Sequence, residues 1–114
     1  MADCVFCRIV SKQSAVELLY EDDQMAAWSD IRPQAPVHFL VVPKLHIPTL
    51  LDLEKTSDPL IGNMMRCAVQ LAKSKGIAQD GFRAVFNCNP LGGQTVFHLH
   101  LHVLGGRAMG WPPG

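Results

Sequence analysis

The chain has 114 residues, of which 48% are hydrophobic and 18% charged, the composition of an ordinary globular protein. Ten lysine and arginine residues balance ten aspartate and glutamate residues, and no basic stripe is present, so nucleic acid is not an expected partner. No apolar run has the length of a membrane span, and the first residues lack the pattern of a signal peptide. We therefore expect a single domain over residues 1–114, located in the cytoplasm and without a membrane partner.

The first part of the chain predicts a short helical turn followed by three strands. Residues 5–10 are mostly apolar and suit a helical turn that packs on the body of the protein. Residues 17–20 and 24–29 read as two strands with a polar turn between them, which predicts a hairpin. Residues 30–36 contain two prolines and are expected to form a loop. Residues 37–43 then give a strong strand pattern that ends at a proline.

The second part of the chain predicts one long helix. After one possible helical turn at residues 50–53, Asp58 is expected as the N-cap and Pro59 as the first helical residue. Gly76 is expected to end the helix. A further strand is predicted at residues 82–87. The apolar residues that recur at helical spacing are Leu60, Ile61, Met64, Ala68, Leu71 and Ala72.

Residues 97–104 alternate strictly between apolar side chains and histidines. Because successive side chains of a strand point to opposite faces, we expect His98, His100 and His102 on one face. The other face then carries Phe97, Leu99, Leu101 and Val103. The turn over residues 89–95 contains two glycines, which would let the backbone approach a ligand closely. A surface cluster, a metal site and a catalytic site remain open, and the glycine turn favours a phosphate held against an imidazole.

These elements predict an α+β fold: a five-stranded antiparallel sheet with one long helix and a short N-terminal helix. The apolar face of the long helix and the apolar face of residues 97–103 are natural partners. The three imidazoles are then expected on the opposite face, with no helix to cover them fully, so that a substrate could lie there.

The expected chemistry of such a site is nucleophilic attack on phosphorus. A neutral imidazole can form a covalent intermediate that water later opens. The attacking ring must be held in one tautomer, with its other nitrogen bonded to a carbonyl or a similar group. A second imidazole could move a proton, while the amides of Gly92 and Gly93 and the hydroxyl of Thr95 could hold the phosphoryl charge.

The segment His98-Leu99-His100-Leu101-His102-Val103-Leu104 resembles the motif of the histidine triad (HIT) family, in which histidines alternate with apolar residues. The segments 30–44, 92–96 and 105–114 resemble the Hint branch of that family, so the likeness covers nearly the whole chain. The resemblance implies a purine nucleoside phosphoramidase with the HIT-like fold. Its substrates would be adenosine 5′-monophosphoramidate and AMP joined to amines such as lysine, and its ligands AMP or GMP.

The resemblance also implies a role for each matching residue. His100 would be the nucleophile, the carbonyl of His98 would fix its tautomer, and His102 would contact the phosphate. His38 would support the triad, and Thr95 would hold the phosphate and leaving group. The implied nucleotide-binding set is Phe6, Ile9, Trp28, Asp30, Ile31, Asn87, Gly93, Gln94, Thr95, Val96, His100, His102 and Trp111.

Cys4 and Cys7 form a Cys-x-x-Cys motif, and family relatives with this motif often bind a structural zinc ion. The resemblance implies the ligands Cys4, Cys7, His46 and His98, which suit a closed tetrahedral site. No cofactor is expected for catalysis. Family members of this branch are homodimers in which the C-terminal tail reaches the active site of the partner, and Trp111 would have that role.

Other interpretations remain open at this point. Cys4 and Cys7 could be plain reduced thiols, as is expected of Cys67 and Cys88. Phe6 and Trp28 could be core residues, and Asp30 could start a turn. The whole protein could be a nucleotide-binding regulatory or scaffold protein, another nucleotidyl hydrolase or transferase of the superfamily, or a metalloprotein. The triad histidines are spaced too widely along a strand to share one zinc ion easily.

Overall fold

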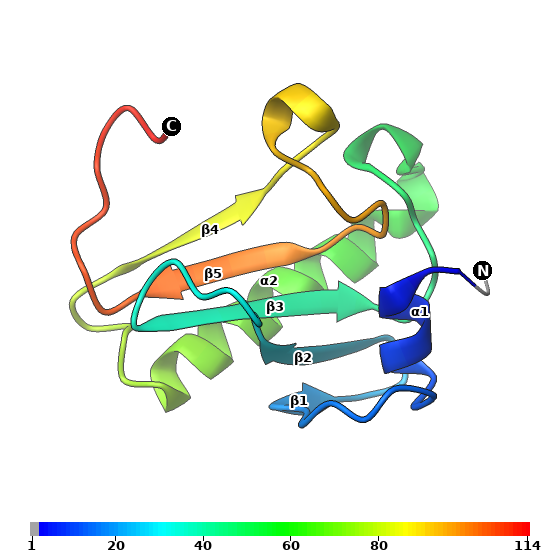
Figure 1. Cartoon of the computed structure of the whole chain (residues 1–114), viewed down its shortest axis with the longest axis horizontal. Helices are drawn as coiled ribbons and strands as arrows, with labels where there is room; N and C mark the ends of the chain where they lie inside the picture. The colour runs from blue at the N-terminus through cyan, green and yellow to red at the C-terminus, as the bar shows by residue number, and fades with distance from the viewer. Residues whose placement is uncertain (1–2) are drawn as a thin grey trace.

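The structure is a computed structural model that describes residues 3–114. These residues form a five-stranded antiparallel sheet with α2 across one face and α1 at one end of the other (Figure 1). The strand order is β1-β2-β3-β5-β4, which confirms the predicted fold class. The strands are β1 (Tyr20–Glu21), β2 (Met25–Ser29), β3 (Val37–Pro43), β4 (Phe82–Phe86) and β5 (Leu101–Gly105). The helices are α1 (Val5–Val10), α2 (Asp58–Ser74) and the 3₁₀ turns η1 (Leu50–Asp52), η2 (Lys55–Ser57) and η3 (Pro90–Gly92).

The long helix α2 supplies the larger core. Its residues Met64, Ala68 and Ala72 are buried at helical spacing and pack on the sheet. The sheet contributes the alternate residues Met25, Ala27, Phe39, Val41, Leu101 and Val103. The predicted pairing of the helix with the apolar face of the histidine segment is confirmed at Leu101 and Val103.

The ends of α2 are set by different local signals. Asp58 is the first helical residue and Ser57 is the N-cap, so the prediction of Asp58 as the cap is wrong by one residue. The reason is that η2 runs directly into the helix and gives Asp58 helical angles of −55° and −46°. At the other end Gly76 has a φ of +76°, a left-handed conformation that favours glycine, as expected for the residue that ends the helix.

The second core lies on the face opposite α2. Phe6, Ile9 and Val10 of α1 pack there, and the sheet residues they meet are Ala26, Trp28, Leu40 and Val42. Helix α1 thus covers one end of this face (Figure 1), so the cover is partial, as the sequence predicted. The hairpin of β1 and β2 is confirmed, although β1 is shorter than predicted and pairs only Tyr20 with Ala27 and Glu21 with Ala26.

The histidine segment is a strand over only part of its predicted length. Residues 97–100 are irregular, and β5 begins at Leu101. The backbone N–H of Leu99 bonds to the carbonyl of Ile47 at 2.6 Å, outside the sheet, because this stretch leaves the sheet to pass the loop after β3. Strict alternation therefore misplaced His98, whose side chain belongs to a different cluster from that of His102. None of the helices in residues 3–114 has the length and apolar character that a membrane crossing requires.

Candidate active site

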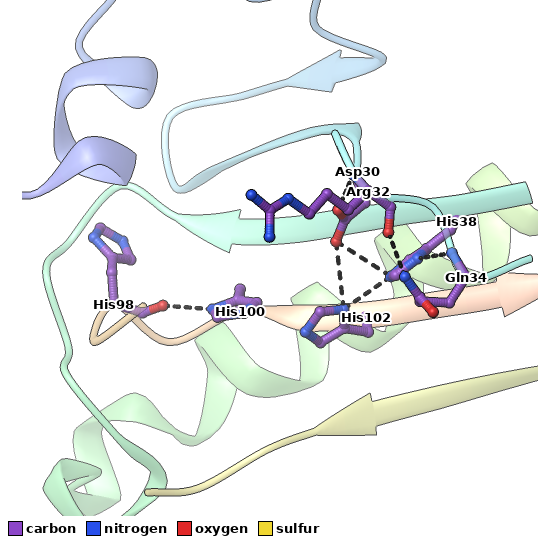
Figure 2. Close-up of polar contacts among 7 residues, drawn as sticks. All are labelled: Asp30, Arg32, Gln34, His38, His98, His100 and His102. Atoms are coloured by element: carbon purple, nitrogen blue, oxygen red, sulfur yellow. Dashed lines mark hydrogen bonds and ion pairs between the residues drawn. The ribbon is translucent and has the colours of Figure 1, made fainter. Parts of the chain in front are cut away.

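His100 stands immediately before β5 and has one ring nitrogen tied to the backbone. Its Nδ1 donates to the carbonyl oxygen of His98 at 2.7 Å (Figure 2). Burial lowers the pKa of His100, while this hydrogen bond and the charge of Asp30 act in the opposite direction. The ring is therefore neutral near pH 7, with its proton on Nδ1 and a lone pair on Nε2. A neutral imidazole held in this tautomer has the form that a nucleophile requires.

The surroundings of His100 are more enclosed than the sequence predicted. His100 is only 8% exposed. The ring of Phe6 packs edge-on against the imidazole of His100, with the ring centroids 5.0 Å apart. Phe6 also meets the rings of His98 and Trp28 edge-on. Helix α1 thus forms one wall of the site, so the histidines do not lie on a fully open face.

His102 is linked to β3 and to the loop before it. The Nδ1 of His102 lies 2.9 Å from the Nε2 of His38, and the Nδ1 of His38 accepts the backbone N–H of Gln34 at 3.0 Å. A carboxylate oxygen of Asp30 lies 3.4 Å from the Nε2 of His38 and 3.9 Å from the Nδ1 of His102. Figure 2 shows these groups on the side of the site away from His98. The ring of His100 lies 4.8 Å from that of His102 between centroids. The structure thus brings Asp30, His38, His100 and His102 together.

The ionisation of this pair follows from its burial. The pKa of His102 is lowered to about 4, chiefly by burial and in smaller part by the neighbouring His100 and His38. The negative charge of Asp30 opposes this change. Burial also lowers the pKa of His38. Both rings are neutral at pH 7 and can each offer one donor and one acceptor.

The Cys-x-x-Cys motif of Cys4 and Cys7 lies beside His46 and His98. The Sγ of Cys4 is 3.3 Å from the Nδ1 of His98, and the Sγ of Cys7 is 3.2 Å from the Nδ1 of His46. The two Nδ1 atoms of His46 and His98 are 3.2 Å apart. In a tetrahedral zinc site, bond lengths near 2.0–2.3 Å place neighbouring ligand atoms about 3.3–3.8 Å apart. These four residues form a group that could hold a metal ion.

The tautomer of His98 favours the same conclusion. Its Nε2 donates to the carbonyl oxygen of Pro43 at 2.7 Å. In the neutral ring the Nδ1, which faces the thiols, is therefore unprotonated and has a free lone pair. Metal-binding histidines commonly donate their other nitrogen to a carbonyl in this way. His98 is completely buried, whereas the sequence had predicted it on an open sheet face with His100 and His102.

The glycine turn before the histidines is held by its own glutamine. Gln94 is buried, its Oε1 accepts the backbone N–H of Asn89 at 2.8 Å, and its Nε2 donates to the carbonyls of Pro48 and Val96. The side chain of Gln94 is thus used within the loop, so only its backbone could meet a nucleotide. Gly93 has a φ of +89°, and a Cβ there would lie 3.8 Å from the Nδ2 of Asn87. Thr95 is exposed beside this turn.

Other residues of the predicted nucleotide-binding set differ in their surroundings. Phe6, Ile9 and Trp28 are buried in the second core, which is the packing role that the sequence left open. Ile31 instead is 94% exposed. Val96 is half-buried and packs against the second core. Asp30 does start a turn, because its Oδ1 accepts the backbone N–H of Arg32 at 2.8 Å, but its other oxygen faces the histidines.

Trp111 is 85% exposed, and within residues 3–114 no hydrogen bond or ring contact joins it to the histidines. The tail that carries it lies at the end of the sheet away from α1 (Figure 1). Arg83 on β4 donates to the carbonyl of Gly110 at 2.7 Å, and Arg107 donates to the carbonyl of Gln34 at 3.0 Å. The tail is therefore tied to the sheet just before Trp111.

Sequence reasoning named the carbonyl of His98 but missed two other backbone groups that fix the rings. The carbonyl of Pro43 and the amide of Gln34 each hold one histidine. No residue type marks these positions, because any residue offers a carbonyl and any residue except proline offers an amide.

Comparisons with known proteins identify relatives over nearly the whole chain. The family model described as "Scavenger mRNA decapping enzyme C-term binding" matches residues 3–110. The purine nucleoside phosphoramidase of Escherichia coli K12 is 40% identical over 108 residues, which cover 95% of this chain and 91% of that protein. A HIT family hydrolase from Legionella pneumophila superposes with a TM-score of 0.96 at 46% identity, covering 98% of this chain and 100% of the other.

A third relative bears on the Cys/His group. The crystal structure of a zinc-bound histidine triad family protein from Mycobacterium smegmatis has a TM-score of 0.78 and 32% identity, and the match covers 99% of this chain and 81% of that one.

A sheet that carries paired histidines against a short helix, together with these matches, defines the class of histidine triad proteins. The chain belongs to the histidine triad family, and its similarity is to hydrolases of that family.

Proposed function

We propose that the protein hydrolyses purine nucleoside 5′-phosphoramidates through a nucleotide bound covalently to His100. The observation that carries this proposal is the 2.7 Å hydrogen bond from the Nδ1 of His100 to the carbonyl of His98, which leaves Nε2 with a lone pair. The similarity to the E. coli purine nucleoside phosphoramidase supports the choice of substrate.

The reaction would run in two displacements. In the first, Nε2 of His100 bonds to phosphorus and the phosphorus–nitrogen bond of the substrate breaks, with the leaving amine taking a proton from solvent. The proton stays on Nδ1 and remains hydrogen-bonded to the carbonyl of His98, which stabilises the positive ring that forms. In the second, water attacks phosphorus and releases the nucleoside monophosphate, one proton and the neutral ring.

The other predicted residues would hold the nucleotide around this centre. His102 would contact the phosphoryl oxygens, with His38 behind it, and the amide of Gly93 and the hydroxyl of Thr95 would share their charge. Asp30 would bind the ribose, Asn87 would support the phosphate turn, and the exposed Ile31 would cover the base. Phe6, Ile9 and Trp28 would support the base from the core beneath it.

A panel of substrates tests this proposal. Purified protein is incubated with adenosine 5′-monophosphoramidate, AMP–lysine and a dinucleotide joined by a phosphoanhydride, and nucleotide release is followed by chromatography. Release of AMP from the two phosphoramidates is expected. A preference for the anhydride would favour another nucleotidyl hydrolase, which the decapping-enzyme family model makes a specific second candidate. AMP binding without turnover of any substrate would favour a regulatory nucleotide-binding protein.

We further propose that Cys4, Cys7, His46 and His98 bind one structural zinc ion. The donor set, the spacing of its atoms and the bare Nδ1 of His98 all suit tetrahedral zinc. The ion would connect α1 to the loop after β3 and to the histidine segment. The chemistry at His100 needs no cofactor in this proposal.

The proposal includes a homodimer in the cytoplasm. Trp111 is exposed and tied to the sheet at Gly110, so it could reach the active site of a second copy. Its ring would then lie on the leaving-group side of the phosphate. Nucleic acid and membranes are not part of the proposed function.

A further inference from the structure

The contact between His38 and His102 determines more than the position of a ring. We propose that the backbone amide of Gln34, acting through His38, fixes His102 in the tautomer that carries its proton on Nε2, so that His102 donates to a phosphoryl oxygen. Gln34 is then a positioning residue that acts through its main chain. The donor role rests on the proposed function, whereas the tautomer is a property of the free protein.

The first step concerns His38. An amide N–H can only donate, so the Nδ1 of His38, 3.0 Å from the amide of Gln34, must be bare. The neutral ring therefore carries its proton on Nε2. A charged ring would set its own Nδ1–H against the amide N–H, so the contact also keeps His38 neutral. The lowering of its pKa by burial acts in the same direction.

The second step transfers this choice to His102. The Nε2–H of His38 has two nearby acceptors, the Nδ1 of His102 at 2.9 Å and a carboxylate oxygen of Asp30 at 3.4 Å. Only the shorter distance lies in the usual range of a hydrogen bond. The Nδ1 of His102 therefore accepts, and the proton of the neutral ring is on Nε2.

The third step compares His102 with His100. The two rings lie 4.8 Å apart between centroids and have opposite tautomers. His100 keeps its proton on Nδ1 against the carbonyl of His98, and so presents a lone pair. His102 presents an N–H. The reversed tautomer of His102 would turn a second lone pair toward the anionic phosphoryl group, which would repel it.

The loop is built to hold this amide. The side-chain Nε2 of Gln34 donates to the carbonyl of Arg32 at 3.0 Å, and Arg107 donates to the carbonyl of Gln34 at 3.0 Å. Pro33 and Pro36 flank the residue and restrict the backbone on both sides. The amide is thus fixed from within the loop and from the segment after β5.

Nitrogen-15 NMR of the histidine rings of the free protein tests the inference. Two-bond proton–nitrogen spectra tell which ring nitrogen is protonated. Wild-type protein should show the proton of His102 and His38 on Nε2 and that of His100 on Nδ1. Gln34→Pro, which removes the amide proton, should convert His102 to a mixture of tautomers. Gln34→Ala keeps the amide and should retain the wild-type pattern of His102.

Kinetics with AMP–lysine adds a second measurement. Gln34→Pro should lower kcat roughly tenfold, with KM near that of the wild type, because a lost donor acts on the transition state. His38→Phe removes the Nε2–H that donates to His102. This variant should convert His102 to a mixture of tautomers, and it provides the test even if Gln34→Pro fails to fold. A bare Nε2 on His102 in wild-type protein, or an unchanged tautomer in His38→Phe, would overturn the inference. The predicted tautomers without any phosphoramidate turnover would support it while contradicting the proposed function.

Discussion

Among single residues, backbone groups determine which ring nitrogen of a histidine is unprotonated. The carbonyl of Pro43 leaves Nδ1 of His98 bare, and the carbonyl of His98 leaves Nε2 of His100 bare. Because a neutral imidazole has one donor and one acceptor, each backbone contact sets the character of the opposite nitrogen. Neighbouring histidines of one motif can therefore serve a metal site and a nucleophile.

The pH dependence of stability is predicted at this scale. The pKa of His102 falls from 6.5 to about 4 on folding, chiefly because of burial. Between these two values the unfolded chain binds more protons, so the free energy of unfolding falls as the pH is lowered from about 6.5 to 4. In urea titrations, His102→Gln should lose less stability than wild type between pH 7 and pH 4, by on the order of 3 kcal/mol. Parallel pH curves for the two proteins would contradict the assigned burial effect.

At the scale of elements, the two helices have different functions. Helix α2 buries Met64, Ala68 and Ala72 against the sheet, away from the histidines. Helix α1 has only six residues, too few for a stable helix on its own, and its cap residue Cys4 and its residue Cys7 belong to the Cys/His group. We infer that a bound ion would hold α1, and with it the wall formed by Phe6, in place.

Removing the two thiols tests this role of α1. The double variant Cys4→Ser, Cys7→Ser should lose about one zinc ion per chain and unfold at a temperature about 5 °C lower or more, while keeping part of its activity. Elemental analysis and thermal unfolding measure the two effects. Cys88→Ser, outside the group, should keep its zinc. Full stability of metal-free protein, prepared under reducing conditions with zinc supplied, would refute the structural site.

Two adjacent methionines test the packing of α2. Met64 is completely buried in the larger core, whereas Met65 is 40% exposed. Met64→Ala should therefore lower the free energy of unfolding by about 2–5 kcal/mol. Met65→Ala should change it by less than about 1 kcal/mol. Urea unfolding of the two variants measures this difference, and equal losses would show that the orientation of the helix is wrong.

At the scale of the whole molecule, the sheet separates stability from chemistry. One face packs against α2, and the other has α1 packed at one end and carries His38 and His102 farther from α1 (Figure 2). The tail leaves the sheet after β5, turns at Gly106 with a φ of +90°, and is tied to β4 through Arg83. Trp111 follows this contact and is exposed, which suits a contribution to a second copy.

Deleting residues 110–114 tests that contribution. If Trp111 covers the leaving group in the partner, the deletion should change the selectivity among AMP–amine conjugates more than it changes AMP affinity. A control that lacks only residues 113 and 114 keeps Trp111 and should retain the selectivity. The comparison uses kcat/KM for a series of amines together with AMP binding. An equal loss for all amines and for AMP would mean that the tail supports only the fold or the dimer.

The fold was largely predictable because its elements follow strong periodic patterns. The apolar positions of α2 and the β3 pattern were correctly identified, since burial on one face imposes a period. The strand predicted at residues 97–104 was too long at its start. The alternation of side chains continues through residues 97–100, but His98 lies outside the sheet, in the Cys/His group next to the loop after β3. The cluster of Cys4, Cys7, His46 and His98 was predicted only through a family resemblance. The contact of Gln34 with His38 could not be predicted, because it uses a backbone amide.

A mass spectrum taken during turnover shows whether His100 forms a covalent bond to the nucleotide. Protein is mixed with an AMP conjugate of a good leaving group, denatured without acid at successive times, and digested for peptide mapping. The proposed mechanism predicts one nucleoside monophosphoryl group on His100, early in the reaction, and its absence from His100→Ala. That variant should also lose activity by several orders of magnitude while remaining folded. A nucleotide attached to another residue, or near-normal turnover by His100→Ala, would contradict it.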